Sequence, residues 1–329
     1  MRAFQHSSVR SADEAVTALR ADTEGMTSVI AGGAELLSLM KANLIAPTHI
    51  IDLKPARELR GVTFADDGSV RIGALTTLAD IERDATLAER LPILPASVRE
   101  AATPQLRNMA TVGGNLMQRN RCWYFRGPYT CWQKGGDQCF ARGGQNKYHA
   151  IFDESPCVAV HPSDLAPALL ALEASVMVVG PSGERTMALS ELLRPPTPER
   201  RRETTLASDD VITAVTIPAQ PTGARGVYLK VMDRQAWAYA LVSAAAQISL
   251  QDGRVERARL VLGGVANTPH RLPDVERALE GQTLTPELAA QSAERAIQGA
   301  TPLEHNAYKV QLARELTRRA ILQAAGLEW

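Results

Sequence analysis

Residues 30–41 read IAGGAELLSLMK, in which a short apolar strand passes through a Gly-Gly turn into a helix expected over residues 34–41. Because glycine has no Cβ atom, such a turn lets backbone N–H groups point at a phosphate, and the helix N-terminus adds its dipole. Thr111-Val-Gly-Gly-Asn115 repeats the pattern. Neither stretch is a Walker loop or a GxGxxG fingerprint, and a single Gly-Gly pair more often makes only a tight turn. Two such turns favour a dinucleotide site, because a diphosphate needs donors from more than one side.

The composition is that of an ordinary globular chain. The length of 329 residues suggests two or three domains, or one large one. Hydrophobic residues make up 45% and charged residues 22%, which is enough apolar material for a real core. The formal net charge is zero and indicates neither nucleic acid nor an anionic membrane surface as a partner. The first residues, MRAFQHSSVRSADEAV, lack the apolar region of a signal peptide, and no apolar run approaches the ~18 residues of a membrane span. We therefore expect a cytoplasmic protein, whose cysteines stay reduced unless they bind metal.

The pattern of elements predicts a mixed fold. In the first half, strand-like and helix-like segments alternate, and Ser11-Ala-Asp-Glu14 begins the first helix as a capping box. Residues 103–115 look extended and turn-rich, and residues 194–208 form an exposed loop rich in proline and charge. The segments expected beyond this loop are strands at Val211–Ile217, Gly226–Val231, Ala244–Leu250 and Ala258–Val265, a hairpin turn at Gln251–Arg254, and a last helix from about His305 to Ala325. This end is typical of an antiparallel sheet backed by helices.

Three motifs occur in order along the chain, and together they carry a resemblance. They are IAGGAELLSLMK at residues 30–41, TPQLRNMATVGGNL at residues 103–116 and HPSDLAPALLAL at residues 161–172. In this order they resemble the FAD-binding medium subunit of the molybdenum hydroxylases, the xanthine dehydrogenase and aldehyde oxidoreductase family. The resemblance covers nearly the whole chain, because the C-terminal segment also fits that subunit.

The resemblance implies an α+β architecture. Two subdomains would form an FAD-binding fold of the vanillyl-alcohol-oxidase (PCMH) type, at residues 1–56 and 57–218. A C-terminal α+β domain, like that of the carbon monoxide dehydrogenase flavoprotein, would occupy residues 219–329. An iron–sulfur insertion would lie within the second subdomain, at about residues 118–158.

The resemblance also implies which residues bind FAD. They are Ile30, Ala31, Gly32, Gly33, Ala34 and Glu35 at the pyrophosphate; Thr111, Gly114 and Asn115 in a second loop; Ala102 beside the ring system; Asp164 at a ribose or ribityl hydroxyl; and Ile212 and Lys230 at the adenine and the flavin pyrimidine edge. Simpler alternatives are a helix N-cap for Asp164, a core position for Ile212 and a solvated strand position for Lys230. Position 34 is often a hydroxyl residue in the family and is alanine here, so the backbone must carry that phosphate contact.

All four cysteines lie in residues 121–157, which we name the cysteine segment; it also holds eight of the fifteen aromatic residues. Their spacing is C-x8-C-x7-C-x17-C, without the C-x2-4-C pairs usual for structural zinc. Confinement to one polar, glycine-rich stretch argues for four thiolates at one centre, because isolated structural cysteines would be scattered through the core. An iron–sulfur cluster fits this pattern best, with zinc second and free thiols third. His149 and His161 could substitute as ligands, although a lone histidine is more often structural.

The resemblance sharpens this prediction. Most subunits of the family run almost directly from the Gly-Gly-Asn turn to the Ser-Asp helix, whereas about forty residues intervene here. Some members, including hydroxybenzoyl-coenzyme A reductase and certain bacterial aldehyde oxidoreductases, carry an extra [4Fe-4S] cluster at this place. The predicted ligands are Cys122, Cys131, Cys139 and Cys157. The excess of Lys and Arg in this region would offset the negative charge of a four-thiolate cluster. The alternative is a solvated loop that happens to carry more basic than acidic residues. The aromatic side chains would shield the cluster, pack the loop or dock a partner.

The resemblance therefore implies an oxidoreductase subunit of a heterotrimer, with FAD and a [4Fe-4S] cluster. Electrons would come from a large molybdenum-cofactor subunit through a [2Fe-2S] small subunit, and would leave FAD for NAD or another acceptor. The chemistry belongs to the flavin, so we expect no catalytic side chain. The partner would select the substrate, aldehyde or heterocycle, and a partner's export signal would place the complex in the periplasm instead. Two other functions stay open, a stand-alone FAD oxidase or reductase and a metal-stapled redox-sensing or assembly protein.

Overall fold

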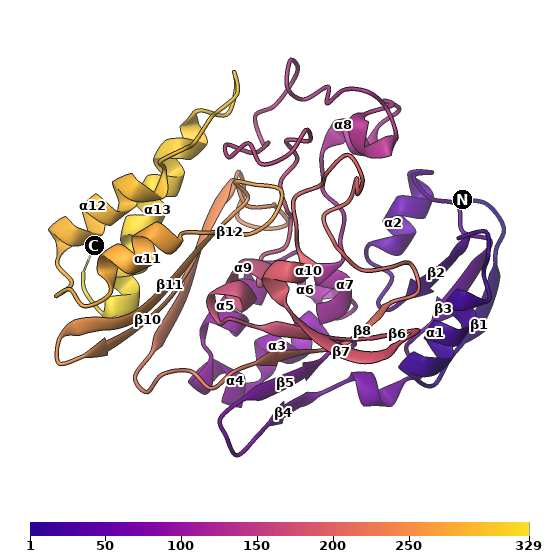
Figure 1. Cartoon of the computed structure of the whole chain (residues 1–329), viewed down its shortest axis with the longest axis horizontal. Helices are drawn as coiled ribbons and strands as arrows, with labels where there is room; N and C mark the ends of the chain where they lie inside the picture. Colours follow the sequence, from indigo (N-terminus) through magenta and orange to yellow (C-terminus); the bar gives the residue numbers. More distant parts are fainter. Residues whose placement is uncertain (329) are drawn as a thin grey trace.

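The computed structural model describes residues 1–328 and contains three β-sheets with helices packed around them (Figure 1). In the view of Figure 1 the chain starts at the sheet on the right, passes through a central sheet and ends among the helices on the left. The cysteine segment crosses the top of the molecule, where the short helix α8 (Trp123–Arg126) lies. The architecture is α+β, as predicted.

The first sheet has three parallel strands in the order β1-β3-β2. Its elements are β1 (Gln5–Ser8), α1 (Ala12–Arg20), β2 (Thr27–Ile30), α2 (Leu36–Lys41) and β3 (His49–Asp52). The Ser11 side chain accepts a hydrogen bond from the Glu14 N–H and so begins α1 at the predicted place, but the reciprocal bond of a capping box is missing because Glu14 Oε2 accepts the Arg10 N–H instead. The second helix begins at Leu36 rather than at Ala34, because Gly33 has φ +77° and the next two residues complete a turn.

The central sheet has five strands in the order β4-β5-β8-β6-β7, and all neighbours are antiparallel. Its strands are β4 (Val62–Phe64), β5 (Val70–Gly73), β6 (Ser175–Gly180), β7 (Gly183–Ala188) and β8 (Val211–Ile217). The other elements of this part are η1 (Arg57–Leu59), α3 (Leu78–Arg83), α4 (Ala85–Arg90), α5 (Ile93–Arg99), α6 (Pro104–Arg107), α7 (Val112–Leu116), η2 (Trp132–Lys134), α9 (Leu165–Ala171) and α10 (Leu189–Leu192). The extended segment predicted for residues 103–115 is wrong, because Thr103 and Thr111 each cap a short helix.

The third sheet has four antiparallel strands in the order β12-β11-β10-β9. Its elements are β9 (Arg225–Val231), β10 (Val242–Gln251), β11 (Arg254–Gly263), β12 (His270–Arg271), α11 (Pro273–Leu279), α12 (Pro286–Ala296) and α13 (Tyr308–Ala325). Asp252 and Gly253 both have positive φ and make the predicted hairpin turn. Both faces of the sheet are covered, since Ala244 and Ala246 join the core under α13 while Ala245 joins the central core.

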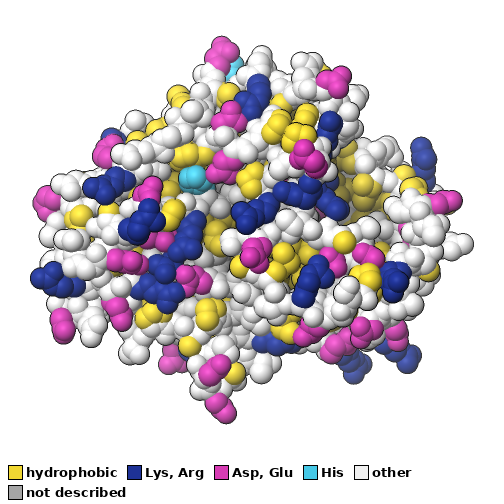
Figure 2. Space-filling view, viewed as in Figure 1, with side chains coloured by type: hydrophobic (Ala, Val, Ile, Leu, Met, Phe, Trp, Pro, Cys, Tyr) yellow, Lys and Arg dark blue, Asp and Glu magenta, His cyan; other side chains and the backbone are white. Residues whose placement is uncertain are grey.

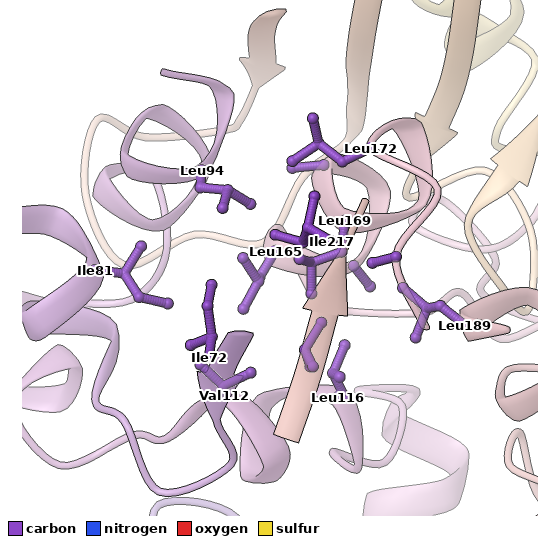
Figure 3. Close-up of a cluster of buried hydrophobic side chains, with 14 of the residues drawn as sticks. Ile72, Ile81, Leu94, Val112, Leu116, Leu165, Leu169, Leu172, Leu189 and Ile217 are labelled. Carbon is purple, nitrogen blue, oxygen red and sulfur yellow. The ribbon is translucent and has the colours of Figure 1, made fainter. Parts of the chain in front are cut away.

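The largest hydrophobic core lies beside the central sheet. Helix α9 supplies Leu165 and Leu169, and Leu172 follows directly after the helix. All three side chains are completely buried. In Figure 3, Leu165 lies between Ile72 and Ile217 of the central sheet, and Leu169 lies next to Ile217. The helix is apolar on every side because it also packs against β10 and β11. This packing puts the N-terminal end of α9 between the central and third sheets.

The surface mixes both signs of charge. On the face in Figure 2, Lys and Arg side chains are interspersed with Asp and Glu, in keeping with the zero net charge. No helix within residues 1–328 combines the length and the apolar character that crossing a membrane requires. The predicted domain boundaries fall between sheets, since β3 ends at Asp52 and β8 ends at Ile217, and the division into domains stays a prediction.

The central core gives a stability prediction. We expect Leu169→Ala to lower the free energy of unfolding by about 2–5 kcal/mol, because it removes buried methyl groups and leaves a cavity. Urea unfolding followed by circular dichroism measures the change. The matched control is Leu250→Ala at the exposed end of β10, which should cost less than about 1 kcal/mol. Equal losses from the two variants would contradict the assignment of α9 to the core.

Candidate functional site

The two glycine turns lie against each other. A Cβ atom at Gly32, in the first turn, would stand 1.6 Å from the Met109 carbonyl oxygen, so only glycine fits there. The segment after Met109 runs directly into the second turn, where Thr111 Oγ1 accepts the Gly114 N–H at 3.3 Å. The Gly113 N–H in turn donates to the Ala74 carbonyl at 2.9 Å, which ties the second turn to the end of β5. The two glycine turns, which were predicted to bind the same diphosphate, are therefore neighbours in space.

A cavity of about 370 Å³ opens between these turns; we name it the first cavity. Its volume is within the roughly 300–1,000 Å³ usual for ligand pockets. The predicted FAD residues that line it are Ala31, Gly32, Gly33, Ala34, Glu35, Ala102, Thr111, Gly114, Asn115, Asp164 and Ile212. Only Ile30 and Lys230, among the thirteen, do not line it. Ile30 lies just behind the wall, since its side chain borders the space beside Gly33.

Asp164 and Lys230 form a buried ion pair at the edge of the first cavity. Lys230 Nζ donates to Asp164 Oδ2 at 2.9 Å and to the carbonyl groups of Glu100 and Ala238. The Tyr228 hydroxyl donates to Asp164 Oδ1 at 2.7 Å. Burial raises the pKa of Asp164, although Lys230 and Tyr228 act in the opposite direction. The charged head of Lys230 is therefore not solvated, and removing either partner would leave a buried charge unpaired.

The possible role of Asp164 as a helix cap is wrong. Its side chain makes no capping hydrogen bond, although the residue stands at the N-cap position of α9. Ser163 caps the helix instead, because its Oγ accepts a hydrogen bond from the Ala166 N–H at 2.9 Å. The same hydroxyl donates to Asn115 Oδ1 at 2.5 Å, which connects α9 to the second glycine turn. The carboxylate of Asp164 is thus committed to Lys230 and Tyr228.

Ala102 and Ile212 also line the first cavity, from different elements. Ala102 has φ +53°, a conformation that a non-glycine residue adopts at some cost in energy. Ile212 belongs to β8 and is 7% exposed, so it is both a core residue and part of the cavity wall.

The Glu35 side chain binds the cysteine segment. Arg121 Nη1 donates to one carboxylate oxygen at 2.5 Å, and Arg126 Nη2 donates to the other at 2.6 Å. The Arg119 N–H adds a third hydrogen bond at 3.0 Å. A carboxylate held by two guanidinium groups is oriented and largely neutralised. The Glu35 side chain is therefore occupied by the cysteine segment.

Carboxylates from other parts of the chain pair with arginines in and next to the cysteine segment. Besides the pairs with Glu35, Arg119 Nε donates to the buried Glu203 at 3.2 Å. Burial raises the pKa of Glu203, but Arg119 and two amide donors outweigh burial and hold the pKa below its usual value. Glu203 belongs to residues 194–208, a loop that is largely exposed as predicted but packs on the cysteine segment through Glu203 and Arg201. The solvated loop with a charge bias is therefore the wrong description.

The aromatic side chains pack the cysteine segment against itself. Trp123 lies edge-on to Tyr148 and to His149, with ring centroids 5.7 Å and 5.4 Å apart. Tyr124 stacks on Phe140 at 6.1 Å, and its hydroxyl accepts the Gln145 N–H. These contacts give a segment with few strands and helices a small core of its own.

The four cysteines have no disulfide bonds and come near one another. A hydrogen bond from Cys157 lowers the pKa of Cys139 to about 6, and the same contact raises the pKa of Cys157. Burial raises the pKa of Cys122 to about 11, and the nearby Cys131 and Cys139 add to this. His149 Nε2 lies 3.1 Å from Cys122 Sγ.

Within residues 1–328, no three His, Cys, Asp or Glu side chains are grouped closely enough to hold a metal ion. This finding counts against a mononuclear zinc site. A four-iron cluster spaces its thiolates more widely than a single ion does, and the assignment of the four cysteines as its ligands stays a prediction.

Two aromatic residues at the first cavity were not among those predicted from the sequence. Trp237 and Tyr239 line it, and they are 61% and 50% exposed. The Arg121 guanidinium lies 5.3 Å from the Tyr239 ring centre, so this loop also meets the cysteine segment. Large aromatic residues in a polar loop after a strand were the signal available in the sequence.

Comparison with known protein families gives two matches. A model described as the FAD binding domain in molybdopterin dehydrogenase covers residues 2–220, and one described as the CO dehydrogenase flavoprotein C-terminal domain covers residues 227–324. Together they account for nearly the whole chain.

Individual proteins agree. The chain is 36% identical to the aldehyde oxidoreductase FAD-binding subunit PaoB of Escherichia coli (strain K12), over 98% of this chain and 99% of the relative. It is 31% identical to the nicotine 6-hydroxylase medium subunit of Paenarthrobacter nicotinovorans, over 98% and 97%. Among solved structures, a chain of carbon monoxide dehydrogenase from Hydrogenophaga pseudoflava matches with a TM-score of 0.78 and 26% identity, over 99% and 98%. The chain therefore belongs to the FAD-binding medium subunits of the molybdenum hydroxylases, a family of oxidoreductase subunits.

Proposed function

We propose that this chain is the FAD- and [4Fe-4S]-carrying electron-transfer subunit of a heteromeric molybdenum hydroxylase. A [2Fe-2S] small subunit would deliver the electrons, a large subunit would hold the molybdenum cofactor, and an external acceptor would receive the electrons. The observation that carries the proposal is the first cavity, where both glycine turns and the buried Asp164–Lys230 pair meet. The compartment stays a prediction of the sequence.

The residues around the first cavity fit FAD. The backbone of Ile30–Glu35 would approach the pyrophosphate, since Gly32 leaves no room for a side chain and Ala34 offers no hydroxyl. Thr111, Gly114 and Asn115 would complete that site from the second turn. When bound, FAD supplies the exchange of one or two electrons. Asp164 would accept a hydrogen bond from a sugar hydroxyl, and Lys230 would hold this carboxylate in place and balance its charge from behind the cavity wall.

The cysteine segment supports a cluster next to FAD. Its four cysteines form no disulfide bond, and all of them are at least partly buried. Cys122 lies near Cys131 and Cys139, and Cys139 contacts Cys157. Glu35 ties the segment to the first glycine turn through Arg121 and Arg126. A cluster held by Cys122, Cys131, Cys139 and Cys157 would therefore lie beside the flavin site. Neighbouring hydrogen bonds, such as the contact of His149 with Cys122, would tune its potential.

The first glycine turn gives a test of FAD binding. We expect Gly32→Ala to reduce the ratio of FAD to protein at least about tenfold, because the new Cβ would collide with the Met109 carbonyl and push the two turns apart. Flavin absorbance after purification measures the ratio. Gly143→Ala is the matched control, since nothing lies within 4 Å of a Cβ at that glycine. Full FAD content in the Gly32 variant would refute the pyrophosphate assignment.

The cysteine segment gives a test of the cluster. The parent protein should contain about four iron atoms per chain, and Cys131→Ser should lose at least half of them while keeping its FAD. Iron analysis and the visible spectrum before and after dithionite provide the measurement. Thr130→Ser is the control, because it changes the preceding residue without removing a thiol. A parent protein with FAD but no iron would eliminate the cluster and leave the flavin proposal standing.

The partners require a separate measurement. The native complex, purified through a tag on this chain, should contain a [2Fe-2S] protein and a molybdenum protein in equal amounts. Mass spectrometry and molybdenum analysis identify them. A chain that purifies alone with bound FAD and turns over by itself would instead support a stand-alone flavoenzyme.

A further inference from the structure

Lys309 is a completely buried lysine in the first turn of α13. Its Nζ donates to the carbonyl oxygens of Gly264 at 2.5 Å, His149 at 2.8 Å and Tyr148 at 3.3 Å. These three bonds use every donor of the ammonium group. All three acceptors are neutral, and no Asp or Glu side chain within residues 1–328 forms an ion pair with Lys309. The fold therefore buries a positive charge without an opposite one.

This burial is unfavourable for the charged form of the lysine. A buried charge costs free energy unless an opposite charge lies near it. Burial lowers the pKa of Lys309 to about 7, and no carboxylate in the described part of the chain counteracts this. The first turn of a helix is also its positive end, which adds repulsion. An anion near Lys309 would offset both effects and keep the ammonium group charged.

The hydrogen bonds of Lys309 lead toward a predicted cluster ligand. His149, whose carbonyl accepts from Lys309, has its ring Nε2 3.1 Å from Cys122 Sγ. Asn306, which comes just before α13, donates from Nδ2 to the same carbonyl at 3.1 Å and to the Ala150 carbonyl at 2.9 Å. The start of α13 therefore fixes residues 148–150 of the cysteine segment, and His149 connects the ammonium group to Cys122.

The other basic side chains that contact the cysteine segment differ from Lys309. Those paired with carboxylates are Arg119, Arg121, Arg126, Arg142 and Lys147. Lys134 and Arg201 donate to carbonyl groups, but both side chains are partly exposed. Salt screens exposed charges, whereas it screens a buried charge much less. In the described part of this region, Lys309 is thus the fully buried cation that has no acidic partner.

A [4Fe-4S] cluster would supply the missing negative charge. Its four thiolates give the cluster a net negative charge, and reduction by one electron makes that charge more negative. A fixed positive charge nearby therefore stabilises the reduced cluster more than the oxidised one.

We propose that Lys309 is the buried counter-charge of the predicted cluster and that it favours the reduced form. The inference rests on the proposed function, because it requires the cluster held by the four cysteines. In the redox step the cluster gains one electron, while Lys309 stays protonated and forms or breaks no covalent bond.

The test compares cluster potentials in the purified complex that carries both FAD and iron. Electron paramagnetic resonance at set potentials gives the ratio of reduced to oxidised cluster, and the signal that Cys131→Ser removes identifies this cluster. Lys309→Gln keeps N–H donors but removes the charge. At the midpoint potential of the parent protein it should lower the ratio about tenfold, which is about 59 mV for one electron. Lys309→Met removes the donors as well and should lower the ratio by a similar factor.

Two further variants separate charge from hydrogen bonding. Asn306→Leu removes two hydrogen bonds to residues 149 and 150 but no charge, so it should change the ratio less than about threefold. Lys147→Met removes a lysine whose side chain is 51% exposed, and it should change the ratio equally little because solvent screens that charge. Equal shifts in Asn306→Leu and Lys309→Gln would refute the inference, because hydrogen bonding would then explain both.

The iron and FAD contents separate this inference from the proposed function. A parent protein without iron defeats the cluster assignment, and the inference with it. An iron-loaded parent whose ratio is unchanged or raised in Lys309→Gln overturns the inference alone. Loss of iron but not of FAD from Lys309→Gln, with full iron in Asn306→Leu, supports it. Loss of iron from both variants, or of iron and FAD together from Lys309→Gln, overturns it, because Lys309 would then be needed only for folding.

Discussion

The close approach of Gly32 to the Met109 carbonyl determines where the flavin site can be. The first glycine turn leaves the first sheet, and Met109 leads into the second turn, which is hydrogen-bonded to the end of β5 in the central sheet. This backbone contact joins the turns of two sheets, which also pack on each other through a hydrophobic core that α1 shares with β6 and β8. The lining of the first cavity follows from it, because each sheet contributes its own turn. A side chain at residue 32 would disturb both turns at once, which explains why glycine is needed there independently of any phosphate.

A second connection depends on the first. Glu35 follows the first glycine turn directly, and its carboxylate holds Arg121 and Arg126 of the cysteine segment. Residues 119–126 are thus positioned by the same turn that borders the first cavity. The third sheet contributes Lys230 of β9, whose ammonium group donates to the Asp164 carboxylate at the start of α9. Each structural part contributes one buried or half-buried ionic contact to the same region, and the site exists only when all of them are packed together.

Much of this was predictable from local sequence. The strands beyond residue 208 and the Asp252–Gly253 hairpin follow from periodicity and turn chemistry, which act over a few residues. Eleven of the FAD residues that the family resemblance implied line one cavity. The helix start at Leu36 was missed, since the left-handed Gly33 extends the turn. The Asp164–Lys230 pair joins residues 66 positions apart, and no pattern in sequence reports such a contact before packing is known.

The charge of the cysteine segment shows why the composition of a short stretch is a poor guide to its exposure to solvent. Counted alone, the segment is basic, and solvent exposure is the simplest reading of such an excess. In the fold Arg121 and Arg126 of the segment pair with Glu35 at the start of α2. Arg119, two residues before the segment, pairs with Glu203 from the loop that follows β7 and α10. These carboxylates are partly or fully buried, and without the arginines they would have to be desolvated unpaired. The basic excess therefore balances acidic residues elsewhere in the chain. It follows that the segment is built to fold against the FAD-binding part, and not as an independent module.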